Sequence, residues 1–115
     1  MDPTWSASEA LDILREEGAD EWLIRHCIAV FGVSVYLASL IMARGRELDM
    51  GLVMWGSLLH DLGRTRTHGP EHGYVSGQML RERGFGRNLV RLVERHVGGG
   101  IDAEEASKLG LPKRD

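Results

Sequence analysis

The stretch LVMWGSLLHDLGR at positions 52–64 determines the fold class that we expect. Eight uncharged residues lead into His60 and Asp61, and a glycine follows two positions later. Asp49, just upstream, can cap the start of a helix, and glycine commonly follows the end of one. Continuous apolar character is typical of a helix that is buried on all sides. The stretch therefore predicts a core helix over 50–61 that ends with a polar pair.

Similar start and stop signals divide the rest of the chain. Ser6 and Glu9 have the spacing of a capping box, and Asp20 can cap a second helix. No stretch alternates with period two for long enough to make a strand. The expected fold is therefore all-α, a compact bundle of about five to six helices. These helices cover 7–17, 21–44, 50–61, 70–84 and 87–97, with a short sixth helix over about 102–110.

Composition limits the class of protein further. The 115 residues are 43% hydrophobic and 27% charged, with a net charge of -3 and one cysteine. This length suits a single domain, with an N-terminal helix over 1–20, a central part over 21–100 and a short helix and tail over 101–115. A lone cysteine, Cys27, suits a reducing compartment, so we expect a cytoplasmic protein. The N-terminus carries Asp2 and Glu9 and no basic run followed by an apolar one, so we expect no signal peptide. The slight acidic excess argues against a general nucleic-acid binder.

Residues 27–43 form a run of 17 uncharged residues, which raises the question of a membrane. Seventeen residues is the lower limit for a helix that spans a bilayer. A fully buried central helix has the same composition. Arginines flank the run, and Gly32, Ser34 and Ser39 interrupt it, so we expect a core helix and no membrane partner.

The five histidines are the most informative residues: His26, His60, His68, His72 and His96. Four of them fall on the apolar stripe or at the apolar end of four separate expected helices, and His68 does not. A single inward histidine is usually a core residue with satisfied hydrogen bonds. Burying four imidazoles is costly unless something binds their ring nitrogens, and a metal ion would offset that cost for all four.

Asp61 can join the histidines only under a geometric condition. Neighbouring residues on a helix point about 100° apart, so His60 and Asp61 face one point only if the site lies over the helix end or the carboxylate bridges two ions. Alternatively, Asp61 pairs with a nearby arginine. Mixed imidazole and carboxylate ligands suit one or two ions of iron, manganese, cobalt or nickel better than magnesium.

The sequence resembles the HD superfamily of metal-dependent phosphohydrolases in three motifs. HDLGR at 60–64 is similar to the family's His-Asp-(Ile/Leu)-Gly-Lys segment, with Arg64 in the place of the lysine. HGYVSGQML at 72–80 and RHVG at 95–98 resemble the third and fourth histidine motifs of the six-ligand branch, which includes HD-type diadenosine tetraphosphate hydrolases. This resemblance extends over about 22–111.

The resemblance implies a set of metal ligands. His26, His60 and Asp61 would bind a first ion, and His72 and His96 a second, with Asp61 bridging the two. The family uses a further aspartate on a later helix, and the sequence offers no match to it. Asp102 and Asp115 stand in other places, so the chain is expected to be short at its C-terminal end.

The resemblance also implies two functions. The first is a phosphohydrolase that cleaves a phosphomonoester or phosphoanhydride, with a nucleotide as the favoured substrate. Asp61 and Arg64 would be catalytic, Arg64 and Arg66 would bind phosphate, and His68 would be either a general acid or a surface loop residue. The alternative is a metal- or nucleotide-binding module with little turnover.

Aromatic residues and assembly give two further expectations. Trp22 and Tyr36 are expected inside core helices, which leaves Tyr74 and Phe85 as candidates for stacking on a nucleobase. A helical bundle without its last helix would expose an apolar groove, and such surfaces usually pair with another chain. We therefore expect a homodimer.

Overall fold

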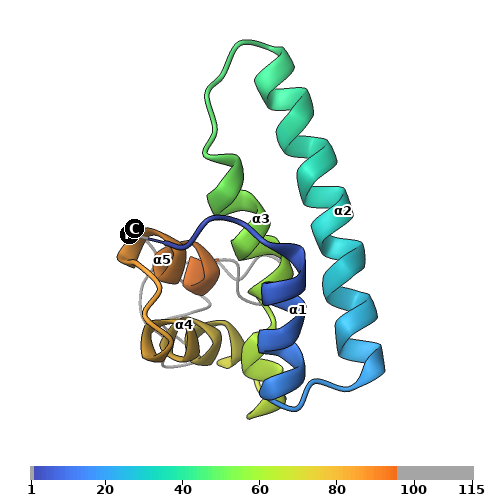
Figure 1. The fold of residues 1–115 in the computed structure, drawn as a ribbon, viewed down its shortest axis with the longest axis vertical. Coiled ribbons are helices and arrows are strands. Elements are labelled where there is room, and N and C mark those ends of the chain that lie inside the picture. The colour runs from blue at the N-terminus through green and yellow to red at the C-terminus, as the bar shows by residue number, and fades with distance from the viewer. Residues whose placement is uncertain (1, 96–115) are drawn as a thin grey trace.

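The computed structural model describes residues 2–95 of the chain (Figure 1). This part holds five α-helices and a short 3₁₀-helix, η1, and no strand. The all-α expectation is thereby confirmed for the described residues. The elements are α1 (Ala7–Glu16), α2 (Glu21–Ala43), α3 (Met50–Leu59), η1 (Leu62–Thr65), α4 (His72–Glu82) and α5 (Arg87–Arg95).

The helices begin where the sequence places capping residues. The side chains of Ser6, Asp20 and Asp49 accept hydrogen bonds from backbone N–H groups in the first turns of α1, α2 and α3. The glycines that follow α1, α2 and α4 have φ near 90°, a backbone conformation that residues with a side chain rarely adopt. Both ends of α1 and α2 are therefore encoded locally.

Two helix boundaries differ from the expectation in the region of the site. The helix expected over 50–61 ends at Leu59, and His60 and Asp61 form the turn between α3 and η1. The helix expected from Pro70 begins at His72. The end of the helix expected over 87–97, the short helix over 102–110 and the residues His96, Asp102 and Asp115 lie outside the described residues.

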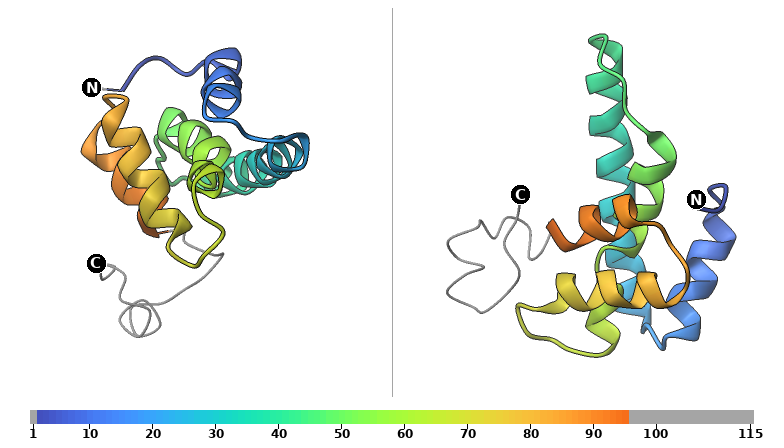
Figure 2. Two further views of the ribbon diagram at one scale, coloured as in Figure 1. Left: turned by 90° about the horizontal axis from the view of Figure 1, so that it is seen from below. Right: turned by 90° about the vertical axis from the view of Figure 1, so that its left-hand side faces the viewer.

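The core lies where α1, α3, α4 and α5 meet the first half of α2. Its largest members are Trp55, Leu14, Leu59, Met79 and Leu89, all almost fully buried. Helix α3 contacts α1, α2 and α5, and α4 contacts both α5 and η1 (Figure 2). The central position of α3 brings its C-terminal turn, with the His-Asp pair, close to three other elements.

The expectation that 27–43 is a buried core helix is wrong for the described structure. The second half of α2 rises beyond α1, α4 and α5 in both side views, next to the 44–49 connection and the start of α3 (Figures 1 and 2). Only 11% of its most apolar 18-residue window is buried. Within residues 2–95, α2 alone is long and apolar enough to cross a membrane by length and composition, and one such helix is weak support for a membrane protein.

Candidate metal centre

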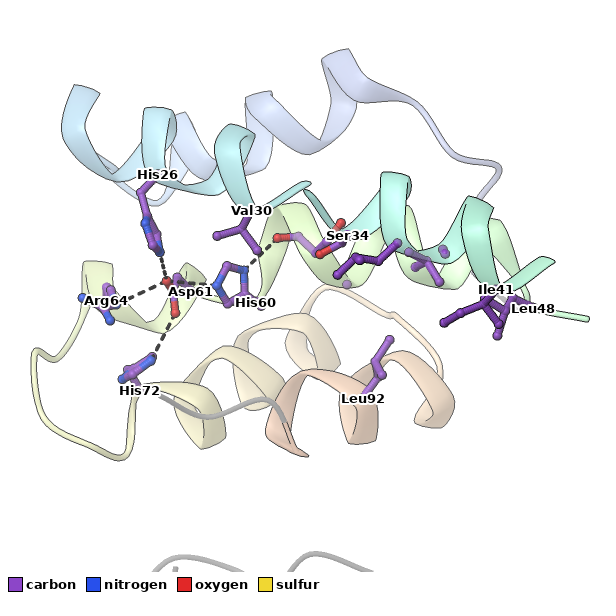
Figure 3. Close-up of a pocket in the computed structure, with 15 residues that line it drawn as sticks. His26, Val30, Ser34, Ile41, Leu48, His60, Asp61, Arg64, His72 and Leu92 are labelled. Atoms are coloured by element: carbon purple, nitrogen blue, oxygen red, sulfur yellow. Dashed lines mark hydrogen bonds and ion pairs between the residues drawn. The ribbon is translucent and has the colours of Figure 1, made fainter. Parts of the chain in front are cut away.

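Three histidines and an arginine surround the carboxylate of Asp61 (Figure 3). Nε2 of His26, from α2, lies 2.8 Å from Oδ2 of Asp61, and Nε2 of His60 lies 3.1 Å from the same oxygen. Nε2 of His72, at the start of α4, lies 3.1 Å from Oδ1. Nε of Arg64, in η1, lies 3.4 Å from Oδ2. Four elements thus contribute to one site, and Asp61 itself is almost fully buried.

The turn that carries Asp61 is fixed against α4 by a close backbone approach. The N–H of Gly63 donates to Oγ of Ser76 at 2.6 Å, and that hydroxyl donates to the carbonyl oxygen of His72 at 2.8 Å. A Cβ atom at Gly63 would collide with that carbonyl oxygen and lie 2.7 Å from the backbone nitrogen of Ser76. Glycine is therefore required at this position for the two segments to meet.

Two of the histidines are oriented by their second ring nitrogen. Nδ1 of His60 lies 2.7 Å from the carbonyl oxygen of Ser57, and Nδ1 of His72 lies 3.1 Å from that of Gly69. A carbonyl oxygen only accepts, so each Nδ1 carries the proton. In a neutral ring, Nε2 then presents a lone pair to the Asp61 oxygens, and two acceptors face each other.

Two acceptors that face each other are stabilised by positive charge between them, so these residues fit a cation. Either the imidazoles are protonated, or a metal ion lies between the nitrogens and the carboxylate, and imidazole and carboxylate are common ligands of transition metals. The possible ligand atoms of His26, His60 and Asp61 all lie within 4.8 Å of one another. These three residues could hold one ion on Oδ2, and His72 faces the other oxygen of the same carboxylate.

The electrostatics of the metal-free site favour charge separation. Burial opposes ionisation of Asp61, but hydrogen bonds from His60 and His72 and the charges of His60 and Arg64 hold its pKa well below the usual range. The hydrogen bond to Asp61 raises the pKa of His72, although burial opposes this. Burial, with a smaller contribution from the charge of Asp61, raises the pKa of the Cys27 thiol to about 12. Cys27 is accordingly a core residue that stays protonated.

The predicted arginines differ in their placement. Arg64 lies at the site, and its buried Nε has no hydrogen-bond partner although it forms the ion pair with Asp61. Arg66, expected to bind phosphate beside it, lies elsewhere: its guanidinium pairs with Glu82 at 3.2 Å and with Glu17 at 3.5 Å. The turn of η1 separates these side chains, so adjacency in sequence does not bring both to one site.

His68 also lies away from the centre. It is exposed in the loop between η1 and α4 and does not line the pocket at Asp61. A role as general acid is therefore not supported, whereas its alternative interpretation as a surface loop residue agrees with its position. His96 lies outside the described residues.

A pocket of about 600 Å³ extends from the centre along the second half of α2. Val30, Ile41 and Leu48 line one wall, and Leu92 of α5 faces them (Figure 3). The polar end of this pocket holds the histidines and Arg64. A ligand with a phosphate at the centre would thus meet a mostly apolar surface beyond it.

One aromatic residue beside the site was not predicted from the sequence. Trp22, expected inside a core helix, is 62% exposed. Its indole stacks on the imidazole of His26 with ring centroids 5.3 Å apart and planes inclined by 2°. The spacing of four residues on one helix was the available signal, because such neighbours share a helix face. Of the two residues expected to stack on a base, Phe85 is buried and contacts Trp55.

Comparison with known proteins identifies the class. The HD domain family model matches residues 23–114, so the chain belongs to the HD domain family. HD domains are usually metal-dependent hydrolases, and the centre contains residues that could hold a divalent ion.

Three relatives show where similar chains occur. The chain is 49% identical over 107 residues to the uncharacterized protein MJ0778 of Methanocaldococcus jannaschii. It is 42% and 43% identical to parts of two proteins named tRNA (cytidine(56)-2'-O)-methyltransferase, from Picrophilus torridus and Thermoplasma volcanium. The match takes in 93%, 93% and 89% of this chain, and it covers 63%, 30% and 29% of the respective relatives. No solved structure matches at a significant level.

Proposed function

We propose that this protein is a metal-dependent phosphohydrolase that cleaves a phosphomonoester or phosphoanhydride, with a nucleotide as the favoured substrate. One observation carries the proposal: the Nε2 atoms of three histidines converge on the buried carboxylate of Asp61. In two of them Nδ1 carries the proton, so each neutral ring would face the carboxylate with a lone pair unless a cation lies between them. Membership of the HD domain family supports the same chemistry.

The residues present divide into two groups of ligands. His26, His60 and Oδ2 of Asp61 would hold one ion, and His72 with Oδ1 would contribute to a second. When bound, a divalent transition metal supplies Lewis acidity that lowers the pKa of water and polarises a phosphoryl group. Fe, Mn, Co and Ni suit this ligand set better than Mg.

The remaining chemistry comes from Arg64. Its side chain is one-third exposed beside the centre, so part of the guanidinium can reach a ligand in the pocket. Arginine binds phosphate oxygens through paired N–H groups and stabilises the negative charge of phosphoryl transfer. The ion pair with Asp61 holds Nε in place while this happens.

The test is phosphate release after removal of all metal and reloading with Mn, Co, Fe or Ni. The substrate panel contains nucleoside mono-, di- and triphosphates, diadenosine tetraphosphate and p-nitrophenyl phosphate. Arg64→Gln should lower kcat/KM by about 100-fold or more. Arg66→Gln is the matched control and should leave it unchanged, because Arg66 pairs with glutamates away from the site. Bound metal without turnover of any substrate would refute hydrolysis and favour the binding module.

A second candidate substrate is a phosphate ester of RNA. The observation that favours it is the occurrence of similar segments in two proteins named tRNA methyltransferases, of which they form about 30%. The same assay tests it with oligoribonucleotides that end in a 3'-phosphate or a 2',3'-cyclic phosphate. Faster release from these than from free nucleotides would favour the RNA substrate.

A further inference from the structure

The three histidines around Asp61 are held in place in two different ways. The rings of His60 and His72 are each fixed at both nitrogens, because Nε2 faces Asp61 and Nδ1 donates to a backbone carbonyl. Partners of this kind orient metal-binding histidines, and their loss weakens metal affinity by 10- to 100-fold. Within the part of the chain that the structure describes, His26 makes no hydrogen bond through Nδ1.

His26 contacts the indole of Trp22 instead. The two rings are almost parallel, with planes inclined by 2° and centroids 5.3 Å apart. Both residues lie on α2, one turn apart. The His26 side chain is 34% exposed, more than those of His60 and His72, so its surroundings restrict the ring less. The torsion that rotates an imidazole about its bond to Cβ has broad preferences, and a stacked plane narrows them.

We propose that Trp22 is a positioning residue that fixes the ring plane of His26 and so directs Nε2 toward Asp61. For His26, the indole has the role that backbone carbonyls have for His60 and His72. This role also accounts for a tryptophan that is 62% exposed beside a polar centre. The inference rests on the metal site of the proposed function and requires no turnover.

The first test uses the metal-free protein. Ring currents from a stacked indole shift the imidazole protons of His26 upfield in an NMR spectrum. Trp22→Ala should abolish that shift, while the resonances of His60 and His72 stay in place. Trp22→Phe should retain part of it, because a planar ring remains. If the His26 resonances are the same in wild type and Trp22→Ala, the proposal is wrong, whether or not the protein hydrolyses any substrate.

The second test is calorimetric titration with Mn²⁺ or Co²⁺. Trp22→Ala should weaken binding by about tenfold, and Trp22→Phe should stay within about threefold of wild type. Tyr36→Ala is the matched control, because Tyr36 is an equally exposed aromatic residue of α2 that does not line the pocket. Its affinity should equal that of wild type.

A double-mutant cycle with His26→Ala shows whether Trp22 acts through His26. In the His26→Ala background, adding Trp22→Ala should have no further effect on metal affinity. An equal loss in both backgrounds would overturn the proposal, as would a single Trp22→Ala variant within about twofold of wild type. A Trp22-dependent metal site in a protein that releases no phosphate would refute the proposed hydrolysis alone.

Discussion

Both halves of α2 are rich in apolar residues, but their surroundings are opposite. In the first half, Leu23 and Cys27 are buried in the core and His26 reaches the centre. In the second half, Ala38 is the only buried residue, and Val33 and Tyr36 are at least 60% exposed. Apolar sequence therefore does not by itself locate a core. The part of this helix that carries the candidate ligand His26 is the part that tertiary contacts hold.

The largest expected effect is that of replacing Asp61, whose carboxylate faces His26 in the first half of α2. Asp61→Asn removes the charge on which three imidazoles converge, so metal affinity should fall by at least about 100-fold and phosphate release with it. Calorimetric titration with Mn²⁺ and the phosphate assay measure both losses. Asp12→Asn, at an exposed position of α1, is the control. An Asp61→Asn variant with wild-type affinity would show that Asp61 is not a metal ligand.

The next prediction tests the contrast within α2 directly. Leu23→Ala should lower the free energy of unfolding by about 3 kcal/mol, because Leu23 is 5% exposed and packs in the core cluster. Leu40→Ala should change it by less than about 0.5 kcal/mol, because Leu40 is 45% exposed. Urea denaturation of both variants measures the difference. A similar cost at both positions would mean that something covers the second half of α2 in solution, and light scattering would show whether this is the expected second copy.

Two glycines, one at the site and one in α2, should change the stability in opposite directions when alanine replaces them. Gly63→Ala should destabilise the protein by about 2 kcal/mol, because the new methyl group collides with the His72 carbonyl at the site. Gly32→Ala, in the middle of α2, should stabilise it by about 1 kcal/mol, because nothing lies within 4 Å of the added Cβ and alanine favours helix. Thermal unfolding of both variants is the measurement. A destabilised Gly32→Ala would indicate a close partner at that face.

The smallest expected effect is a dependence of the stabilisation by metal on pH. In the metal-free protein the folded pKa of His72 is raised above its unfolded value near 6.5, so its contribution to stability is complete below that pH and is lost as pH rises through the folded pKa. A metal ion bound at Nε2 of His72 would compete with the proton at that atom. The stabilisation by Mn²⁺ should therefore be larger at pH 8 than at pH 6, and equal stabilisation at both values would exclude this coupling.

Much of the fold and part of the centre could be predicted from sequence. Ser6, Asp20 and Asp49 cap helices because capping is a local interaction. The apolar stripes of their helices predicted that His26 and His72 face the core, and His60 ends the apolar run of α3, so the three were expected to converge.

Other features depend on contacts that no local pattern encodes. The run at 27–43 has the same composition whether or not other parts of the chain cover it, so burial could not be inferred from it. The tight turn of η1 directs Arg66 toward Glu17 and Glu82, and sequence adjacency to Arg64 gave no sign of this. Trp22 was missed because its apolar character suggested the core, whereas its neighbour four residues later decides its position.

The convergence of separate segments on one carboxylate has a consequence for folding. The unfolded chain has no such cluster, because His26 and His72 lie 46 positions apart and the groups meet only when α2, the end of α3 and α4 are in place. An ion held there would act as a reversible cross-link, and its binding free energy would add to the stability of the folded state. At a free metal concentration about 100 times the dissociation constant, the gain is about 2.7 kcal/mol. The stability of the folded protein would then depend on the free metal concentration.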